Sequence, residues 1–300
     1  MSTSLKYFRC LPFKGGSRLS LKGEPFLQRS SEMITSATNA KVKQVVQWQN
    51  KARERREADI FLTEGFKMFR EAPSEKIREV YLSADALKKA DSDSAIKEKL
   101  QITGYETVSD EVFRRMSDTK TPQGILCVMK RPSYSIEQMI DHSVPLLILL
   151  EGLQDPGNLG TILRTGEGAG VTGVIFDRET VDIFSSKTIR ATMGSIFRVP
   201  FTCVESLGEV MEILRKKNVC TYAAHLSGET YYDRCCFNTG TAFLIGNEGN
   251  GLSPGLAARA DRLVKIPMEG QVESLNASVA AALLMYEVHR QRRSQAGFKI

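Results

Sequence analysis

Several features that identify particular protein classes are missing from this 300-residue chain. No apolar run approaches the roughly 20 residues that a membrane-spanning helix needs, so no membrane span is expected. The six cysteines contain no C-x-x-C pair and no disulfide-like framework, which fits a reducing compartment. The three histidines lie far apart and match no zinc spacing, so we expect no structural metal.

The stretch EGLQDPGNLGTILRTGEGAGVTGVIF (151–176) has seven glycines but lacks both common nucleotide-binding fingerprints. In a G-x-G-x-x-G loop Gly166 and Gly168 would be the first two glycines, but Val171 occupies the third position, and no lysine is present for a P-loop. The pattern instead predicts a strand, a Pro-Gly turn, a helix and a second strand. Because a helical glycine costs about 1 kcal/mol relative to alanine, we expect Gly166 and Gly168 to let this helix approach another backbone closely. A tightly packed unit without a ligand is the alternative.

The net charge is small overall but uneven along the chain. Lys and Arg total 41 against 35 Asp and Glu, a formal net charge of +6. Residues 1–57 hold twelve basic residues and four acids, which favours a nucleic acid or an anionic surface as partner. The run KARERRE at 51–57 fits a solvated helix face equally well. The candidate nucleic-acid-binding residues here are Lys41, Lys43, Lys51, Arg53, Arg55 and Arg56.

Periodicity and turn residues divide the chain into four segments. Residues 1–32 lack periodicity and predict a poorly ordered extension, which reflects either an upstream start codon before a functional Met33 or a transit peptide. The short loops that follow favour the first reading and a bacterial cytoplasmic protein. Residues 33–130 alternate helices and strands as a small α/β domain, residues 131–144 form a linker, and residues 145–300 form a second domain.

The second domain is expected to be an α/β fold with a mostly parallel sheet and helices on both faces, because its βα loops are short. The expected strands are 146–151, 171–176, 197–204, 219–226, 241–248 and 262–268. The expected helices lie near 159–169, 185–195, 206–217, 253–260 and 276–293.

Three loops of this domain follow the carboxyl ends of expected strands, where ligands bind in open α/β sheets. The first is the glycine-rich stretch, with Asn158 and Arg164. The second, LIGNEGNGLS at 244–253, has one acid, Glu248, among glycines that allow close approach to the backbone. The third, within 266–290, places Ser274 and Asn276 before a long apolar helix. Each loop alone is more often only a turn, but the three together in one domain are a specific signal.

These segments resemble the three motifs of the SpoU branch of the SPOUT superfamily, RNA ribose 2′-O-methyltransferases that use S-adenosylmethionine. The resemblance covers 145–293, although Gly166 and Gly168 replace the usual alanines. It implies a carboxyl-terminal trefoil knot and an active-site set of Asn158, Arg164, Glu248, Ser274 and Asn276. The cofactor contacts that it implies are Ala224, Gly246, Asn247, Gly249, Ile266, Met268 and Leu275. Residues 33–130 resemble, less specifically, the amino-terminal RNA substrate-binding domain of many members.

The implied reaction is attack of a ribose 2′-hydroxyl on the sulfonium methyl, with Arg164 proposed in the family as the base. Because a guanidinium stays protonated in proteins, either a phosphate shares its proton, or the arginine holds the phosphate and the proton leaves by another route. We expect Arg164 to point towards the loops of Glu248 and Asn276. The alternative is that Arg164 pairs with Glu248 only to hold the fold.

The partners expected from this reading are RNA and a second copy of the chain. Ribosomal RNA is favoured over transfer RNA because of the amino-terminal domain. Two other functions are alternatives. The first is a non-catalytic RNA-binding ribosome-assembly factor, and the second is a nicotinamide-dependent oxidoreductase, which the missing fingerprint disfavours. The family dimerises through its knotted domain. The last helix is apolar over too wide an arc for one-sided burial, which supports a homodimer, through Val279, Ala280, Leu283, Leu284 and Tyr286.

Overall fold

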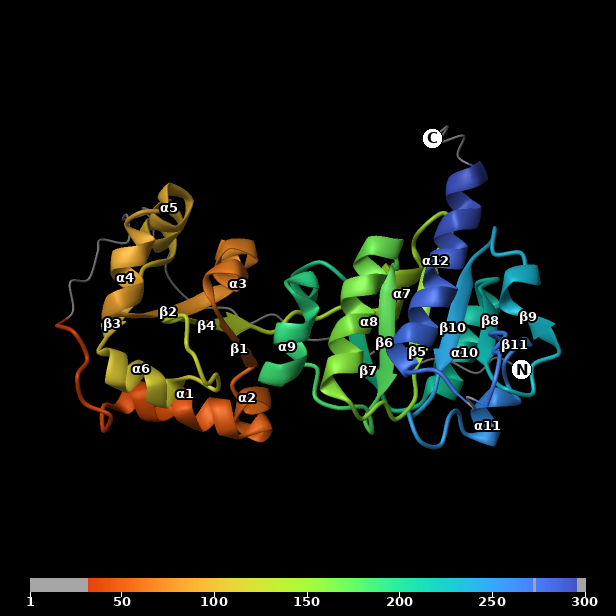
Figure 1. Ribbon diagram of the computed structural model, residues 1–300, viewed down its shortest axis with the longest axis horizontal. Coiled ribbons are helices and arrows are strands. Elements are labelled where there is room, and N and C mark those ends of the chain that lie inside the picture. Colours follow the sequence, from red (N-terminus) through yellow and green to blue (C-terminus); the bar gives the residue numbers. More distant parts are fainter. Residues whose placement is uncertain (1–31, 272–273, 296–300) are drawn as a thin grey trace, which may run out of the picture.

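The computed structural model describes residues 32–271 and 274–295, arranged as two lobes side by side (Figure 1). The predicted extension at 1–32 therefore lies outside the described residues except for Glu32. Within the described ranges no helix is long and apolar enough to cross a membrane.

The amino-terminal lobe, defined here as the elements from α1 to β4, is built on a four-stranded sheet in the order β1-β4-β2-β3. β1 and β2 pair antiparallel with β4, whereas β2 and β3 pair parallel. Ile34 adds a single parallel bridge beside Val108 of β3. Its elements are α1 (Ala40–Asn50), α2 (Ala52–Glu57), β1 (Ile60–Glu64), α3 (Phe66–Glu71), η1 (Ser74–Lys76), β2 (Ile77–Ser83), α4 (Ala84–Ala90), α5 (Ser94–Thr103), β3 (Glu106–Val108), α6 (Asp110–Met116) and β4 (Ile125–Lys130).

The carboxyl-terminal lobe, defined as the elements from α7 to α12, is built on a seven-stranded sheet in the order β7-β6-β5-β10-β8-β11-β9, with every pairing parallel. Its strands are β5 (Leu146–Leu150), β6 (Gly173–Asp177), β7 (Phe201–Val204), β8 (Cys220–Ala224), β9 (Thr230–Tyr231), β10 (Thr241–Ile245) and β11 (Arg262–Lys265). Its helices are α7 (Ile136–Ile140), α8 (Pro156–Ala169), α9 (Ser186–Thr192), η2 (Ser195–Phe197), α10 (Leu207–Lys216), η3 (Tyr232–Arg234), α11 (Pro254–Ala257) and α12 (Ala277–Gln295). This confirms the predicted α/β class with a parallel sheet.

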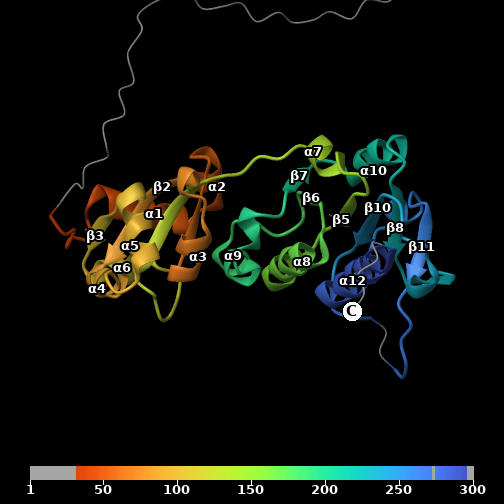
Figure 2. The same cartoon turned by 90° about the horizontal axis from the view of Figure 1, so that it is seen from above.

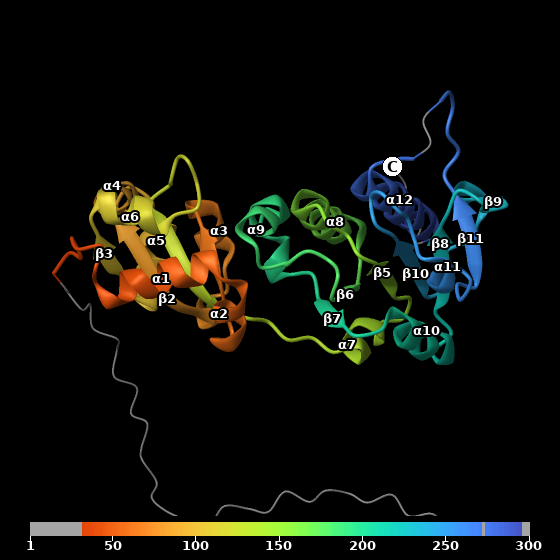
Figure 3. The ribbon, with the colours of Figure 1, turned by 90° about the horizontal axis from the view of Figure 1, so that it is seen from below.

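Helices cover both faces of the seven-stranded sheet. Seen from above and from below, α8, α9 and α12 form a row along one face, and α7 and α10 lie on the other (Figures 2 and 3). The strand residues alternate between these faces: Ile148 and Phe243 belong to the apolar cluster with α8 and α12, and Leu149 and Leu244 belong to the cluster with α7 and α10. A parallel strand buried on both faces reads as a continuous apolar run, which is why LLILL was recognisable from the sequence.

The structure differs from the sequence prediction in the segment 131–144. This segment was expected to be a linker, but it contains α7, whose start is closed by a capping box between Ser135 and Gln138. Met139 and Ile140 of α7 are buried against the sheet. Ile136, Met139 and Ile140 have helical spacing, but five residues are too few for periodicity alone to identify a helix, so its packing against the sheet identifies it.

The glycines of α8 also have a different role from the predicted one. An added Cβ at Gly166 would meet the side chains of Val171 and Met285, and one at Gly168 would meet the Tyr286 hydroxyl at 3.0 Å. Neither position faces another backbone, so this prediction was wrong for both. Close backbone approach occurs instead at Gly160, where a Cβ would lie 2.7 Å from the carbonyl oxygen of Thr188 in α9 and would overlap Ala191.

Candidate active site

Three polar loops lie together at the carboxyl edge of the parallel sheet. β10 pairs with β5 so that Ile245 is opposite Leu150, and the loops after these strands therefore start side by side. The third loop follows β11 and leads into α12, which packs against α8. Residues of three chain segments thus meet at the edge where open α/β sheets bind ligands.

The carboxylate of Glu248 connects the second loop to the first. Oε2 accepts a hydrogen bond from the backbone N–H of Gln154 at 3.0 Å. Oε1 accepts one from the backbone N–H of Asp155 at 3.0 Å and one from the side-chain amide of Asn158 at 2.9 Å. Two of these donors lie at the amino end of α8, where N–H groups lack helical partners and favour an anion. Glu248 therefore holds in place the residues that lead into α8, the helix that carries Arg164.

Two opposing influences act on the ionisation of Glu248. Partial burial is the largest, and it raises the pKa of the carboxyl, but the hydrogen bonds from Gln154, Asn158 and Asp155 lower it, and the pKa ends below its ordinary 4.5. The residue remains solvent-accessible. Glu248 is consequently a carboxylate at neutral pH and acts as a hydrogen-bond acceptor.

Asn158 passes this connection on to the third loop. Its side chain is only 7% exposed; its amide donates to Glu248, and its Oδ1 accepts from the amide of Asn276 at 2.9 Å. Asn276 in turn accepts from the backbone N–H and the hydroxyl of Ser278, at 2.9 and 2.6 Å, at the start of α12. The result is a directed chain of hydrogen bonds, Asn276 to Asn158 to Glu248, which we call the polar relay.

Hydrogen bonds between its own residues hold the turn after β10 in shape. Asn247 and Gly251 exchange backbone hydrogen bonds of 3.0 and 2.9 Å, and Asn247 Oδ1 accepts from the backbone N–H of Gly249 at 2.8 Å. The Asn247 amide donates to the carbonyl of Gly152 at 2.7 Å. A Cβ at Gly246 would overlap the backbone of Gly251 and Leu252, so only glycine fits there.

A second anchor of this turn was missed by the sequence analysis. Glu151, directly after β5, accepts from the backbone N–H of Ser253 at 2.7 Å and from its hydroxyl at 2.6 Å. The Ser253 hydroxyl also caps α11 by accepting from the backbone N–H of Leu256 at 3.3 Å. The available signals were an acid at a strand end and a Ser-Pro helix start, but only the sheet register brings them together.

The remaining predicted cofactor residues lie around the same edge. Ala224 ends β8 and pairs with Val264, while Ile266 and Met268, half-buried, follow β11. Ser274 and Leu275 are exposed in the third loop, before Asn276. Gly249 is exposed, with its N–H bonded to Asn247. The predicted residues are therefore brought to one edge of the sheet from four separate loops.

Arg164 lies apart from the polar relay within one chain. Its side chain is exposed on α8, and among the residues that the structure describes none forms a hydrogen bond or ion pair with it. Its direction towards the loops of Glu248 and Asn276 stays a prediction. The alternative that Arg164 pairs with Glu248 is excluded by the partners of Glu248, which are Gln154, Asp155 and Asn158.

The six basic candidates of α1 and α2 differ in their surroundings. Arg55 is 7% exposed, donates to the carbonyls of Trp48 and Gln49, and forms a 2.6 Å ion pair with Asp182 of the other lobe. Lys41 pairs with Glu106 at 2.6 Å, and Arg53 pairs with Glu57 at 2.7 Å. The exposed residues without a recorded partner in the described ranges are Lys43, Lys51 and Arg56.

The chemistry of this edge suits an organic ligand held by backbone groups. The donor set consists of amides, hydroxyls and single carboxylates that are already hydrogen-bonded. Within residues 32–271 and 274–295, no cluster of three or more His, Cys, Asp or Glu side chains is arranged to hold a metal ion. Gly246 lets the backbone of Gly251 and Leu252 pack closely against it, which keeps the turn at 247–251 compact.

Comparison with known proteins identifies relatives for both lobes. Residues 145–286 match the SpoU rRNA Methylase family, and residues 39–127 match the MRM3-like substrate binding domain. A Bacillus subtilis (strain 168) protein named 23S rRNA (guanosine(2553)-2'-O)-methyltransferase RlmP is 30% identical over 259 residues, which span 86% of this chain and 99% of the relative.

Two solved structures resemble this chain over most of its length. An rRNA methyltransferase from Sinorhizobium meliloti superposes with a TM-score of 0.73 at 29% identity, covering 86% of this chain and 97% of that one. The SpoU methyltransferase AviRb from Streptomyces viridochromogenes, solved in complex with the cofactor AdoMet, has a TM-score of 0.76 at 26% identity, covering 85% and 99%.

Proposed function

The chain belongs to the SpoU rRNA Methylase family, and from this we propose that its active site is the carboxyl edge described above, where the polar relay and Arg164 act on RNA. The enzyme is an RNA 2′-O-ribose methyltransferase that uses S-adenosylmethionine. The relative from Bacillus subtilis is named for 23S rRNA, which favours ribosomal RNA as the substrate.

The observation that carries the site assignment is the polar relay. Three side chains from three loops, Asn276, Asn158 and Glu248, form consecutive hydrogen bonds of 2.9 Å. Buried amides are hydrogen-bonded in non-catalytic proteins as well, but here the bonds join the three loops that follow the carboxyl ends of the strands, where ligands bind in open α/β sheets. The relay sets the orientation of the amino end of α8, and therefore the place where Arg164 leaves the helix.

The cofactor supplies a methyl group on a positively charged sulfur. The residues that would hold it are Gly246, Ile266 and Leu275 through backbone groups, with Ala224 and Met268 beside them and Asn247 and Gly249 shaping the turn. We propose that these loops are threaded as the trefoil knot of the family. The turn then needs its two anchors, Asn247 on Gly152 and Glu151 on Ser253, to keep a fixed shape.

The protein's own groups must align a ribose hydroxyl and assist its deprotonation. Positioning removes much of the entropic barrier of a reaction between two bound molecules. The exposed guanidinium of Arg164 offers a planar fork that holds a phosphate and a hydroxyl together. Ser274 and Asn276 supply neutral hydrogen-bonding groups at the same edge. The proton of the hydroxyl leaves either through the phosphate bound to Arg164 or by a separate route.

A homodimer completes this site in our proposal. α12 buries Ala281, Leu284 and Met285 against its own lobe, yet Val279, Leu283 and Tyr286 on its other side are 47%, 36% and 48% exposed. These residues line an apolar groove of about 470 Å³ that also includes Thr161 of α8 and Tyr232. Because Thr161 is one turn before Arg164, a second copy seated on this groove would bring its loops close to Arg164.

The RNA contact is assigned to the amino-terminal lobe. The exposed cations are Lys43 of α1, Lys51 between the two helices and Arg56 of α2, and Lys41 and Arg53 are exposed beside single acids. Lysine and arginine that neutralise phosphates give an affinity that falls with salt. Arg55 is not part of this surface, because its buried guanidinium donates to the carbonyl of Trp48 and pairs with Asp182. We retain residues 33–130 as the RNA-binding domain, residues 145–300 as the methyltransferase domain, and the bacterial cytoplasm as the location.

The deciding experiment measures methyl transfer by the purified full-length protein. Radiolabelled S-adenosylmethionine is supplied with deproteinised ribosomal RNA or with transfer RNA, and the modified position is mapped as a 2′-O-methyl nucleotide. We expect incorporation into one ribosomal nucleotide. Tight RNA binding with no incorporation into either RNA would favour the assembly-factor alternative, and incorporation into transfer RNA alone would change the substrate.

A further inference from the structure

The two lobes are joined by an apolar contact that includes aromatic rings from both. The ring of Phe61 in β1 lies 5.0 Å from that of Phe184 and 6.3 Å from that of Phe197, measured between centroids. Phe61 is 2% exposed and Phe184 is 8% exposed. The guanidinium of Arg131 lies 4.2 Å above the ring of Phe184. Swinging the lobes apart would expose these rings to water, so the apolar contact opposes separation of the lobes.

Polar contacts surround these rings at the lobe boundary. Arg55 of α2 pairs with Asp182 at 2.6 Å, and Asp118 pairs with Arg190 of α9 at 3.7 Å and also accepts from the hydroxyl of Ser186. Figures 1 and 3 show α9 between the lobes, where it also packs along α8. The boundary between the lobes therefore includes α9, which packs against α8, the helix that carries Arg164.

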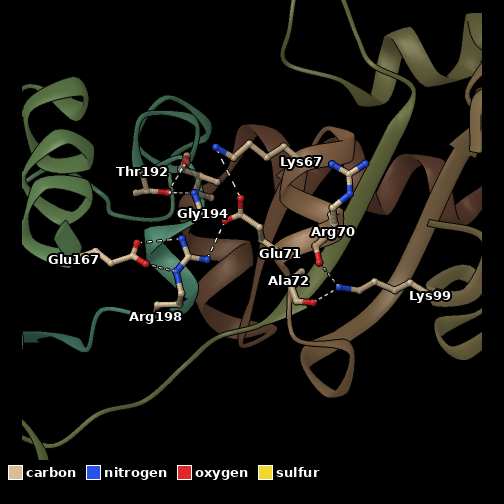
Figure 4. Close-up of polar contacts among 10 residues, drawn as sticks. Lys67, Arg70, Glu71, Ala72, Lys99, Glu167, Thr192, Gly194 and Arg198 are labelled. Carbon is tan, nitrogen blue, oxygen red and sulfur yellow. Dashed lines mark hydrogen bonds and ion pairs between the residues drawn. The ribbon is translucent and has the colours of Figure 1, made fainter. Parts of the chain in front are cut away.

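One side chain, Arg198, links the amino-terminal lobe directly to that helix. Its Nη1 donates to Glu71 at the end of α3 at 2.9 Å. Its Nε and Nη2 both donate to the carboxylate of Glu167 in α8, the Nη2 bond being 3.0 Å long. Figure 4 shows the guanidinium lying between the two acids, which come from different lobes. Glu167 is three residues after Arg164, so the link ends within one turn of it.

The backbone beneath this link is shaped to receive Glu71. α9 ends with Met193 at φ 51° and Gly194 at φ 103°, a left-handed turn that side chains rarely adopt. A Cβ at Gly194 would overlap the carboxylate of Glu71, so the glycine leaves the space that this acid fills. The hydrogen bond from Arg198 lowers the pKa of Glu167, which keeps that acid charged for the link.

We propose that Arg198 is a specificity-determining positioning residue, which sets the distance and angle from the RNA-binding lobe to Arg164 and thereby selects the nucleotide that is methylated. This inference rests on the proposed function. In this proposal the basic face of the amino-terminal lobe binds one part of the RNA. The contacts of Arg198 with Glu71 and Glu167 then determine which ribose of the bound RNA reaches the active site. Arg198 touches neither the cofactor nor the reacting hydroxyl.

A positioning role fits the exposure of the link better than a folding role. The Arg198 side chain is 43% exposed, and exposed ion pairs contribute little to folding stability. The aromatic rings already hold the lobes together. A misplacement of about 1 Å, in contrast, can lower the rate about a hundredfold. Loss of the link should therefore alter RNA turnover while the protein stays folded.

The test uses the full-length protein with Arg198→Ala, Arg198→Lys and Glu71→Gln. The matched control is Arg215→Ala, because Arg215 is 47% exposed and also lies between two acids, Glu212 at 2.9 Å and Asp261 at 3.7 Å, but within one lobe. The measurements are kcat and KM for a ribosomal RNA fragment, S-adenosylmethionine affinity, melting temperature, and a map of the methylated nucleotides.

For Arg198→Ala and Glu71→Gln we expect about a tenfold loss of kcat/KM for RNA, within the range that misplacement produces. Methylation should also appear at neighbouring nucleotides, while cofactor affinity and melting temperature stay close to those of the native protein. Arg198→Lys should be intermediate, because an ammonium cannot hold both acids as a fork does. Arg215→Ala should behave as the native protein.

Two results would overturn the inference, and both differ from failure of the proposed function. The first is an Arg198→Ala variant that methylates the same single nucleotide with native kcat/KM. The second is loss of activity together with cofactor binding and melting temperature in both Arg198→Ala and Glu71→Gln, which would indicate a structural role. If the native protein itself transfers no methyl group to RNA, the proposed function fails instead.

Discussion

Replacing Arg164 by alanine tests the catalytic assignment most directly, because the structure separates its role in folding from its role in chemistry. The side chain is exposed on α8 and forms no recorded hydrogen bond or ion pair in the described ranges. Substitutions at such positions usually change the free energy of unfolding by less than about 0.5 kcal/mol. For a chain of this size that corresponds to a melting-temperature change of about 2 °C or less.

The effect on methyl transfer should be far larger. Removing one preorganised group that stabilises charge in a transition state typically lowers kcat by about 10²–10³. We expect Arg164→Ala to lose at least this much while S-adenosylmethionine affinity stays near the native value, since we propose that the loops after β8, β10 and β11 hold the cofactor. Arg164→Lys should also be poor, because an ammonium lacks the planar fork that could hold phosphate and hydroxyl together.

The assay combines single-turnover methyl transfer to ribosomal RNA, cofactor binding by calorimetry and thermal unfolding, with Arg215→Ala as an arginine control from the opposite face of the sheet. A folded, cofactor-binding Arg164→Ala protein with near-native turnover would refute the assignment. A large fall in its melting temperature would refute the claim that the side chain makes no contribution to the fold.

Four further substitutions test the loops, α12 and the contact between α8 and α9. Glu248→Gln should lower both activity and melting temperature at neutral pH; its deficit in melting temperature should shrink below pH 4.5, since the native carboxyl, with its lowered pKa, becomes protonated as the pH falls through that pKa. A constant deficit by calorimetry would contradict this. Glu151→Gln should raise KM for S-adenosylmethionine about tenfold, the effect of losing a hydrogen bond to a charged group, and an unchanged KM would show that the Ser253 anchor does not shape the turn. Leu283→Asp should give a monomer by light scattering, and a persistent dimer would place the interface elsewhere. Gly160→Val should lower the free energy of unfolding by about 1–3 kcal/mol through overpacking against Thr188 and Ala191. Denaturant unfolding curves that superpose on the native curve would show that α9 shifts to accommodate the larger side chain.

Much of the local structure was predictable because it depends on residues that are neighbours in the chain. LLILL and TAFLI are apolar runs of strand length and are strands in the structure. IREVYLS, rich in β-branched and aromatic residues, is likewise a strand, Ile77–Ser83. Strand ends followed by glycine and one polar residue identified the loops of Asn158, Glu248 and Asn276 as candidates. The helix α7 was missed since its burial depends on a sheet formed by distant residues.

The α/β class, the family and the residues of the three loops could be predicted from the sequence, since periodicity, turn chemistry and motif spacing are local properties. The way in which those residues are used became visible only in the folded chain. The tertiary structure placed Arg55 in an ion pair between the lobes, moved the close backbone contact to Gly160, left Arg164 outside the polar relay, and brought Arg198 between Glu71 and Glu167. The physical reason is that hydrogen bonds and packing join atoms that are near in space, and residues 71, 167 and 198 become neighbours only after both sheets have formed and docked.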